Sequence, residues 1–210
     1  MSESRKKKGR ARRDKEDDSS PRFNITHDPL PLSPEYTQEV QDLMESILEI
    51  GRRGEFQEME NASREALEAH PEIPHFYSYR ANALMALARD QDALEEHCRV
   101  AEKFPGYVFG KIHYGNYLLN TGRLEEIPQV FSNHFDLARL FPEREGFHVS
   151  EALAYCRLAA RYFLLVKEAD RVREYFSIIE QLAPEDPLLA EIRPFLDMHQ
   201  ALENIKADMN

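Results

Sequence analysis

Apolar residues recur every three or four positions through most of the chain, with charged residues between them. This spacing is typical of amphipathic helices that bury one face. The clearest example is the segment 75–105, where the apolar pattern is interrupted near Asp90 and ends at Pro105. It predicts a hairpin of two short helices. One such hairpin leaves apolar surface uncovered, so it needs neighbours of the same shape.

Prolines and turn residues repeat along the chain at a nearly regular distance. The prolines that would end a hairpin are Pro71, Pro105, Pro142 and Pro184, which lie 34, 37 and 42 residues apart. Bends inside the hairpins are indicated at Gly54, at 89–90, at Gly122 and at 167–168. The sequence therefore predicts four hairpins, of which the third and the fourth are irregular. In the third, a helix at 108–120 is expected to pair with one continuous helix at 124–141.

Three of the expected hairpins carry a small residue at the same place in the first helix, namely Ala81, Gly115 and Ala160. At this place the first helix of a hairpin is expected to meet the second closely, and a side chain larger than Ala would hold the two apart. Together with the prolines, these residues resemble the tetratricopeptide repeat, a 34-residue helix-turn-helix unit. The resemblance implies an all-α fold, a right-handed α-solenoid of about four hairpins over residues 33–184. Residues 185–210 are expected to form a capping helix that is kinked near Pro194.

The resemblance also implies a binding groove on the concave side, which the first helices of the hairpins line. The residues expected to face it are Ser78, Asn82, Met85, Phe109, Ile112, Asn116, Arg157 and Arg161. Asn82 and Asn116 occupy equivalent places, where relatives use asparagine to bind a peptide backbone. A primary amide suits this role because it offers both a donor and an acceptor. Alternatively, the two asparagines only face water or cap local structure.

Charge is divided unevenly along the chain, which has a net charge of −11. Residues 1–22 contain nine basic and five acidic residues, whereas the remainder contains 18 basic and 33 acidic residues. Residues 1–32 are predicted to form a disordered tail, because 1–22 are almost devoid of apolar residues and 23–32 are rich in extended-chain signals. The basic cluster of the tail consists of Lys6, Lys7, Lys8, Arg10, Arg12 and Arg13, with Arg5 beside it. It could neutralise the phosphates of RNA or DNA, direct nuclear import or simply be solvated.

Several classes of function find no support in the sequence. No apolar run approaches the roughly 18 residues of a membrane helix, and no signal peptide is recognisable, so we expect a cytoplasmic or nuclear protein without a membrane partner. Motifs for hydrolysis, zinc binding and phosphate binding are absent, and Cys98 and Cys156 are far apart in the sequence. We expect no cofactor, no metal and no enzymatic activity. The prediction is a scaffold or adaptor that binds a peptide or protein segment. The alternative is a nucleic-acid-associated or ribosome-associated accessory protein that is anchored through the tail.

Overall fold

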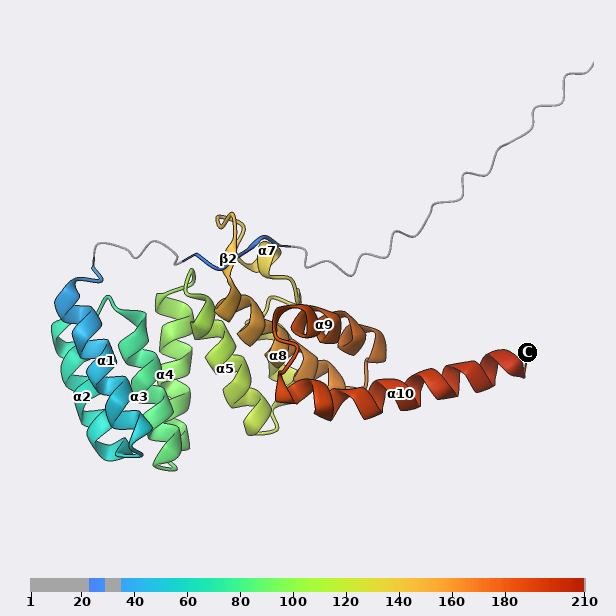
Figure 1. Cartoon of the computed structure of the whole chain (residues 1–210). Coiled ribbons are helices and arrows are strands. Elements are labelled where there is room, and N and C mark those ends of the chain that lie inside the picture. Colours follow the sequence, from blue (N-terminus) through green and yellow to red (C-terminus); the bar gives the residue numbers. More distant parts are fainter. Residues whose placement is uncertain (1–22, 29–34, 210) are drawn as a thin grey trace, which may run out of the picture.

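The structure is a computed structural model that describes residues 23–28 and 35–209. Within these residues the chain forms ten α-helices, one short 3-10 helix and two strands of two residues each. The helices stand side by side in antiparallel pairs and make an elongated row (Figure 1). The predicted all-α, solenoid-like architecture is therefore confirmed.

The first two hairpins are regular. Helix α1 (Gln38–Arg52) pairs with α2 (Phe56–Ala69), and α3 (Pro74–Ala86) pairs with α4 (Asp90–Lys103). The Thr37 hydroxyl caps α1 by accepting a hydrogen bond from the backbone N–H of Val40. Between the hairpins lies a separate core of buried residues: Val40, Ile47, Ile50, Met59, Ala66, Ile73, Phe76, Tyr79 and Ala83.

The same backbone turn connects the two helices of all four hairpins. Its central residue has a positive φ of 77° at Gly54, 56° at Ala88, 73° at Gly122 and 62° at Lys167. The next residue donates its N–H to a carbonyl five positions earlier, as in the bond from Arg89 to Leu84 at 2.9 Å. These turns lie 34, 34 and 45 residues apart, so three hairpins share the predicted period and the fourth is displaced by an eleven-residue extension.

The second helix of the third hairpin is broken. After α5 (Val108–Asn120), the chain forms a 3-10 helix η1 (Leu124–Glu126), α6 (Ile127–Val130) and α7 (Leu137–Leu140). The prediction of one continuous helix at 124–141 is therefore wrong. Ser132 and Asn133 adopt positive φ angles of 50° and 58°, which end α6, and Asp136 caps α7 by accepting the N–H of Ala138. Asn is one of the few residues that tolerate the left-handed conformation.

A short parallel strand pair ties the start of the described chain to the fourth hairpin. Strand β1 (Ile25–Thr26) pairs with β2 (Phe147–His148), which directly precedes α8 (Val149–Leu165). The Phe147 N–H donates to the Asn24 carbonyl at 2.9 Å, and the Phe23 ring packs edge-on against the Phe147 ring. Residues 23–28, which the sequence assigned to the tail, thus lie on the body of the protein.

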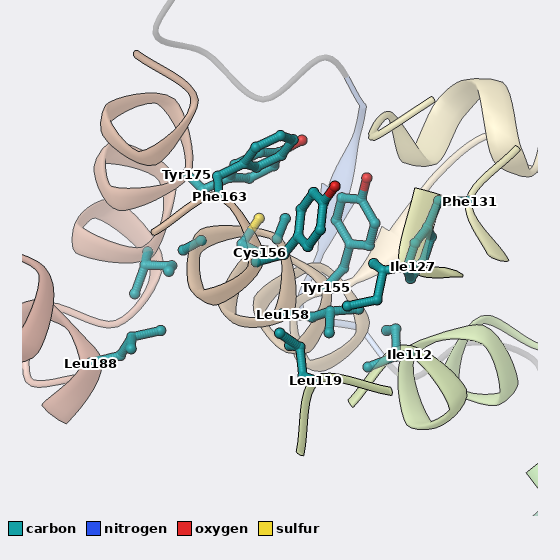
Figure 2. Packing of buried hydrophobic residues seen from close by; sticks show 14 of the residues in the cluster. Ile112, Leu119, Ile127, Phe131, Tyr155, Cys156, Leu158, Phe163, Tyr175 and Leu188 are labelled. Carbon is teal, nitrogen blue, oxygen red and sulfur yellow. The ribbon is translucent and has the colours of Figure 1, made fainter. Parts of the chain in front are cut away.

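The largest core surrounds α8, which pairs with α9 (Ala169–Leu182). Figure 2 shows Tyr155, Cys156 and Leu158 of α8 between Ile112 and Leu119 of α5 on one side and Tyr175 of α9 and Leu188 on the other. Cys156 is fully buried, and burial raises the pKa of its thiol to about 12. This agrees with a reduced core thiol rather than a reactive one.

Gly115, the small residue of the third hairpin, has no space beside it for a side chain. A Cβ atom placed on Gly115 would lie 2.8 Å from Leu158 Cδ2 and 3.0 Å from the Phe131 ring. Leu158 and Phe131 are each 1% exposed, so neither can move away easily. Gly115 therefore permits the close approach of α5 to Phe131 in its own hairpin, as the sequence predicted, and also to α8 of the next hairpin, which the sequence did not predict.

The last helix, α10 (Pro187–Asp208), packs its first turns against α9 and α8 through Leu188, Leu189 and Ile192. Its second half extends beyond α9 (Figure 1). The helix continues through Pro194 without a break, where the sequence suggested a kink or a split. Both Pro194 and Ala190 are exposed, so water can bond the Ala190 carbonyl that the proline leaves without a donor.

Candidate functional site

A pocket of about 690 Å³ lies where α5, α8 and the start of α10 meet. Its wall consists of Asn116 and Asn120 from α5, Ala154, Arg157 and Arg161 from α8, and Asp186, Pro187, Leu188 and Glu191 from the start of α10. Helices α5 and α8 are first helices of their hairpins, so the pocket lies on the side where the repeat pattern predicted a groove.

Two amides and two guanidinium groups converge on this pocket. Asn116 and Asn120 are four residues apart on α5, and Arg157 and Arg161 are four residues apart on α8, so each pair lies on one helix face. Arg161 Nη2 contacts Asn120 Oδ1 over 3.4 Å, a long hydrogen bond that joins the two walls. The pocket thus presents a row of donors together with amide acceptors.

The two arginines are held differently. Arg157 Nε donates to Asp186 Oδ2 at 2.5 Å, and the other oxygen of Asp186 accepts the N–H of Leu188 at 3.0 Å. Asp186 is only 7% exposed, so it both caps α10 and fixes the Arg157 guanidinium. In the described part of the chain, no carboxylate forms an ion pair with the exposed Arg161. Its charge is therefore available to a ligand.

The register of the hairpins explains which predicted residues reach the pocket. Asn82, Asn116 and Arg161 each precede the left-handed residue of their own turn by six positions, so they are equivalent. Asn116 and Arg161 line the pocket. Asn82 is exposed on α3 but is not part of this pocket.

Ser78 and Ile112 occupy the places equivalent to Arg157 but lie in the core, each only 2% exposed. The expectation that they face a groove is wrong for this structure. The reason is that α3 lies between the first helices α1 and α5, and α5 lies between α3 and α8. By contrast, α8 has α5 on one side and only the first turns of α10 on the other. Met85 and Phe109 are half-buried and pack against the larger core.

Half-buried histidines and aromatic rings occupy the adjoining part of α3 and α5. His75 Nδ1 lies 2.9 Å from the Tyr36 hydroxyl, and its ring contacts Tyr107 with 5.0 Å between centroids. Burial lowers the pKa of both His75 and His113 to about 4. These imidazoles are consequently neutral at physiological pH and add no positive charge to this part of α3 and α5.

Some pocket residues were not recognised from the sequence. Asn120 follows Asn116 by four positions, which was a usable signal because such pairs share a helix face. Asp186 followed by Pro187 is typical of the start of a helix, but no sequence pattern indicated that Asp186 would meet Arg157, 29 residues earlier. Glu191 likewise reaches the pocket only because α10 packs across the end of α8.

Other predicted features can be located only in part. The basic cluster from Lys6 to Arg13 lies outside the described residues. Within residues 23–28 and 35–209, no group of three His, Cys, Asp or Glu side chains is arranged to hold a metal ion. In the same residues no helix combines the length and the apolar character that crossing a bilayer requires.

The fold and the pocket together define a helical-repeat protein of the solenoid class. Among the solved structures that resemble it are two tetratricopeptide-repeat proteins. PilF from Pseudomonas aeruginosa has a TM-score of 0.53 and 14% identity over 72% of this chain and 64% of that chain. A double mutant of MamA RS-1 has a TM-score of 0.56 and 14% identity over 82% of this chain and 90% of that chain.

These similarities establish the fold of the chain as that of a tetratricopeptide-repeat solenoid. No family model matches the sequence, and no curated protein matches it either. The predicted resemblance is therefore confirmed by the arrangement of the helices.

Proposed function

We propose that the chain is a protein-interaction scaffold that binds an extended peptide or protein segment along its inner helices. The main contact is the pocket between α5, α8 and α10. The observation that carries this proposal is the convergence of Asn116, Asn120 and Arg161 on one pocket, with Arg161 lacking a carboxylate partner in the described residues. Polar side chains that gather around a concave site are characteristic of binding surfaces.

The chemistry of the pocket suits a peptide backbone. The amides can each donate to a carbonyl and accept from an N–H, and the Arg161 guanidinium can donate to a carbonyl or make two parallel hydrogen bonds to a carboxylate. Ala154 and Leu188 add apolar contact for one ligand side chain. Such a site recognises the backbone of the bound peptide and requires few particular side chains in the peptide. A scaffold needs this property.

The test is to select peptides from a random display library on the intact chain and to measure their dissociation constants by fluorescence anisotropy. We expect Asn116→Ala and Arg161→Ala each to weaken the selected peptides about tenfold, because each removes hydrogen bonds worth about 1.4 kcal/mol. Asn61→Ala is the matched control, since Asn61 is an exposed asparagine on the outer helix α2. Equal affinities for all variants, or no selected peptide at all, would contradict the proposal.

The basic cluster of the N-terminal segment supports a second candidate function, the anchoring of the scaffold to RNA, DNA or a ribosome. Lys6, Lys7, Lys8, Arg10, Arg12 and Arg13 would neutralise phosphates, whereas the acidic remainder of the chain would repel them. Binding of a single-stranded RNA probe should fall steeply with salt and vanish when residues 1–22 are deleted. A deletion variant that binds RNA as the full chain does would exclude this role. A cytoplasmic or nuclear location is consistent with both candidates.

A further inference from the structure

The second half of α10 exposes a stripe of large apolar side chains. Met198, Leu202, Ile205 and Met209 are 58%, 49%, 55% and 82% exposed. Figure 1 shows this half of the helix extending beyond α9, and no other described element lies against it. Isolated exposed apolar residues are common on protein surfaces, but three on one helix face, continued by Met209 at the C-cap, indicate an interaction surface.

The spacing of the stripe is that of a coiled-coil seam. Starting at Phe195, the apolar residues follow at intervals of three, four, three and four, which places them at successive a and d positions of a heptad. This period of 3.5 residues favours a second helix that packs along the whole length of the first with a small angle between the two axes, whichever way the second chain runs. The seam continues the face that α10 turns toward the body, because Phe195 packs against the large core and Leu188 lies seven residues before it, whereas Met198, Leu202 and Ile205 are exposed.

We propose that the partner is a second copy of this chain, whose α10 pairs with the first in antiparallel orientation. An alternation of three and four reads the same in both directions, so the seam is complementary to itself. The same patch on both subunits then gives a closed two-fold dimer, the commonest symmetry of oligomers.

Charge determines the orientation. Outside residues 1–22 the chain carries 33 acidic and 18 basic residues, so two bodies side by side repel each other. A parallel pair would place the bodies at the same end, whereas an antiparallel pair places them at opposite ends. With Phe195 at an a position, the positions beside the seam hold His199, Ala201, Lys206 and Asp208, whose charges nearly cancel, so they favour neither an anionic membrane nor a nucleic acid as the partner.

The size of the seam sets the expected strength. Residues 195–209 span about 22 Å of helix. Four exposed apolar side chains per copy bury less than the roughly 1,200 Å² that stable interfaces reach. The dimer is therefore weak, with a dissociation constant in the micromolar range or above.

The experiment is sedimentation equilibrium of the full chain from about 1 to about 500 µM, a range that brackets micromolar dissociation constants. Leu202→Glu combined with Ile205→Glu is the seam variant. Gln200→Glu combined with Ala207→Glu adds the same charge to exposed positions on the opposite face and is the control. Wild type and control should approach the dimer mass, and the seam variant should dimerise at least tenfold more weakly. All three should keep the same circular dichroism and melting temperature, because the seam residues are exposed in the monomer.

Small-angle scattering of the dimer then tests the orientation, and an elongated particle is expected. A wild type that stays monomeric over the whole range would overturn the proposal, and so would a seam variant that dimerises as well as the wild type. A compact side-by-side dimer would overturn the antiparallel arrangement. Wild-type binding to vesicles of a neutral lipid, lost in the seam variant while the chain stays monomeric, would instead identify a membrane surface as the occupant.

Discussion

The two halves of the molecule build the same kind of hairpin in different ways. Helices α1 to α4 are 13 to 15 residues long and are joined by tight turns, and they keep the 34-residue period. The half from α5 onward contains a broken helix, an eleven-residue extension and a strand pair. The pocket with the convergent amides and arginines lies in this irregular half. Regular repetition provides a rigid support, whereas the departures from it create a distinctive site.

The interior of each half also contains a different kind of interaction in addition to its apolar core. In the regular half, Arg80 of α3 lies between the buried carboxylates of Glu60 on α2 and Glu96 on α4. In the irregular half, aromatic rings fill the space that the broken helix leaves. The Phe135 ring stacks on Tyr162 with 5.0 Å between centroids, and the Tyr175 hydroxyl donates to the Phe135 carbonyl at 2.5 Å. The comparison predicts that the first half is sensitive to charge and the second to volume.

The largest expected effect is that of pH on the junction between the halves, where His75, His97 and His113 lie on α3, α4 and α5. Burial lowers the pKa of each imidazole from 6.5 to about 4. Between pH 6.5 and pH 4 the unfolded chain therefore binds more protons than the folded one. The free energy of unfolding falls as the pH falls through this window, is unaffected by these groups above it and levels off below it.

One pKa unit corresponds to about 1.4 kcal/mol, so the three groups together should remove several kcal/mol between pH 7 and pH 4. Urea unfolding at a series of pH values measures this loss. His97→Phe keeps the ring contact with Tyr117 but cannot take up a proton, so its stability should depend less steeply on pH. Parallel curves for the two proteins would show that His97 does not contribute.

The second prediction concerns the buried charges of the regular half. Arg80→Met leaves Glu60 and Glu96, which are 4% and 3% exposed, without their shared cation. The expected loss is about 3 kcal/mol in the free energy of unfolding at pH 7. Burial already raises the pKa of Glu96, so the loss should shrink as the pH falls and this carboxyl takes up a proton.

Arg99→Met provides the control, because Arg99 also pairs with Glu96 but its side chain is 51% exposed. It should cost less than about 1 kcal/mol. If both substitutions lower the free energy of unfolding by the same amount in urea, the buried ion pairs of Arg80 do not make the regular half especially sensitive to charge.

How far the sequence predicts this molecule also differs between the halves. The small residue Gly115 and the bends at Gly54 and Gly122 could be recognised in the sequence, because glycine is required at these positions for steric reasons. The break after α6 was missed, since Phe131 and Phe135 satisfy the apolar spacing of a helix and only Ser132 and Asn133 argue against one. The pocket was half predicted. Arg157 and Arg161 follow from the repeat, but the approach of Asp186 depends on how α10 packs, and no local pattern encodes that contact.

The third prediction tests the volume sensitivity of the irregular half. Gly115→Ala forces a methyl group to within 2.8 Å of Leu158 Cδ2 and 3.0 Å of the Phe131 ring. Overpacking of this kind should cost about 1 to 3 kcal/mol, measured as a lower urea midpoint with an unchanged slope. Gly106→Ala is the matched control, because nothing lies within 4 Å of the added methyl group. A Gly115→Ala protein as stable as the control would mean that α5 and α8 can separate freely.

The smallest expected effect concerns the turn that both halves share. Ala88 in the regular half and Lys167 in the irregular half hold left-handed conformations that strain any side chain with a Cβ atom. Because Gly adopts this conformation without strain, Ala88→Gly and Lys167→Gly should each raise the free energy of unfolding by about 0.5 kcal/mol, and Gly54→Ala should lower it by about 1 kcal/mol. Thermal and urea unfolding of the three variants measure these changes. Equal gains at Ala88 and Lys167 would show that the irregular half keeps the turn of the repeat intact and departs from the regular half only between its hairpins. A gain at Ala88 alone would place the divergence inside the fourth hairpin itself.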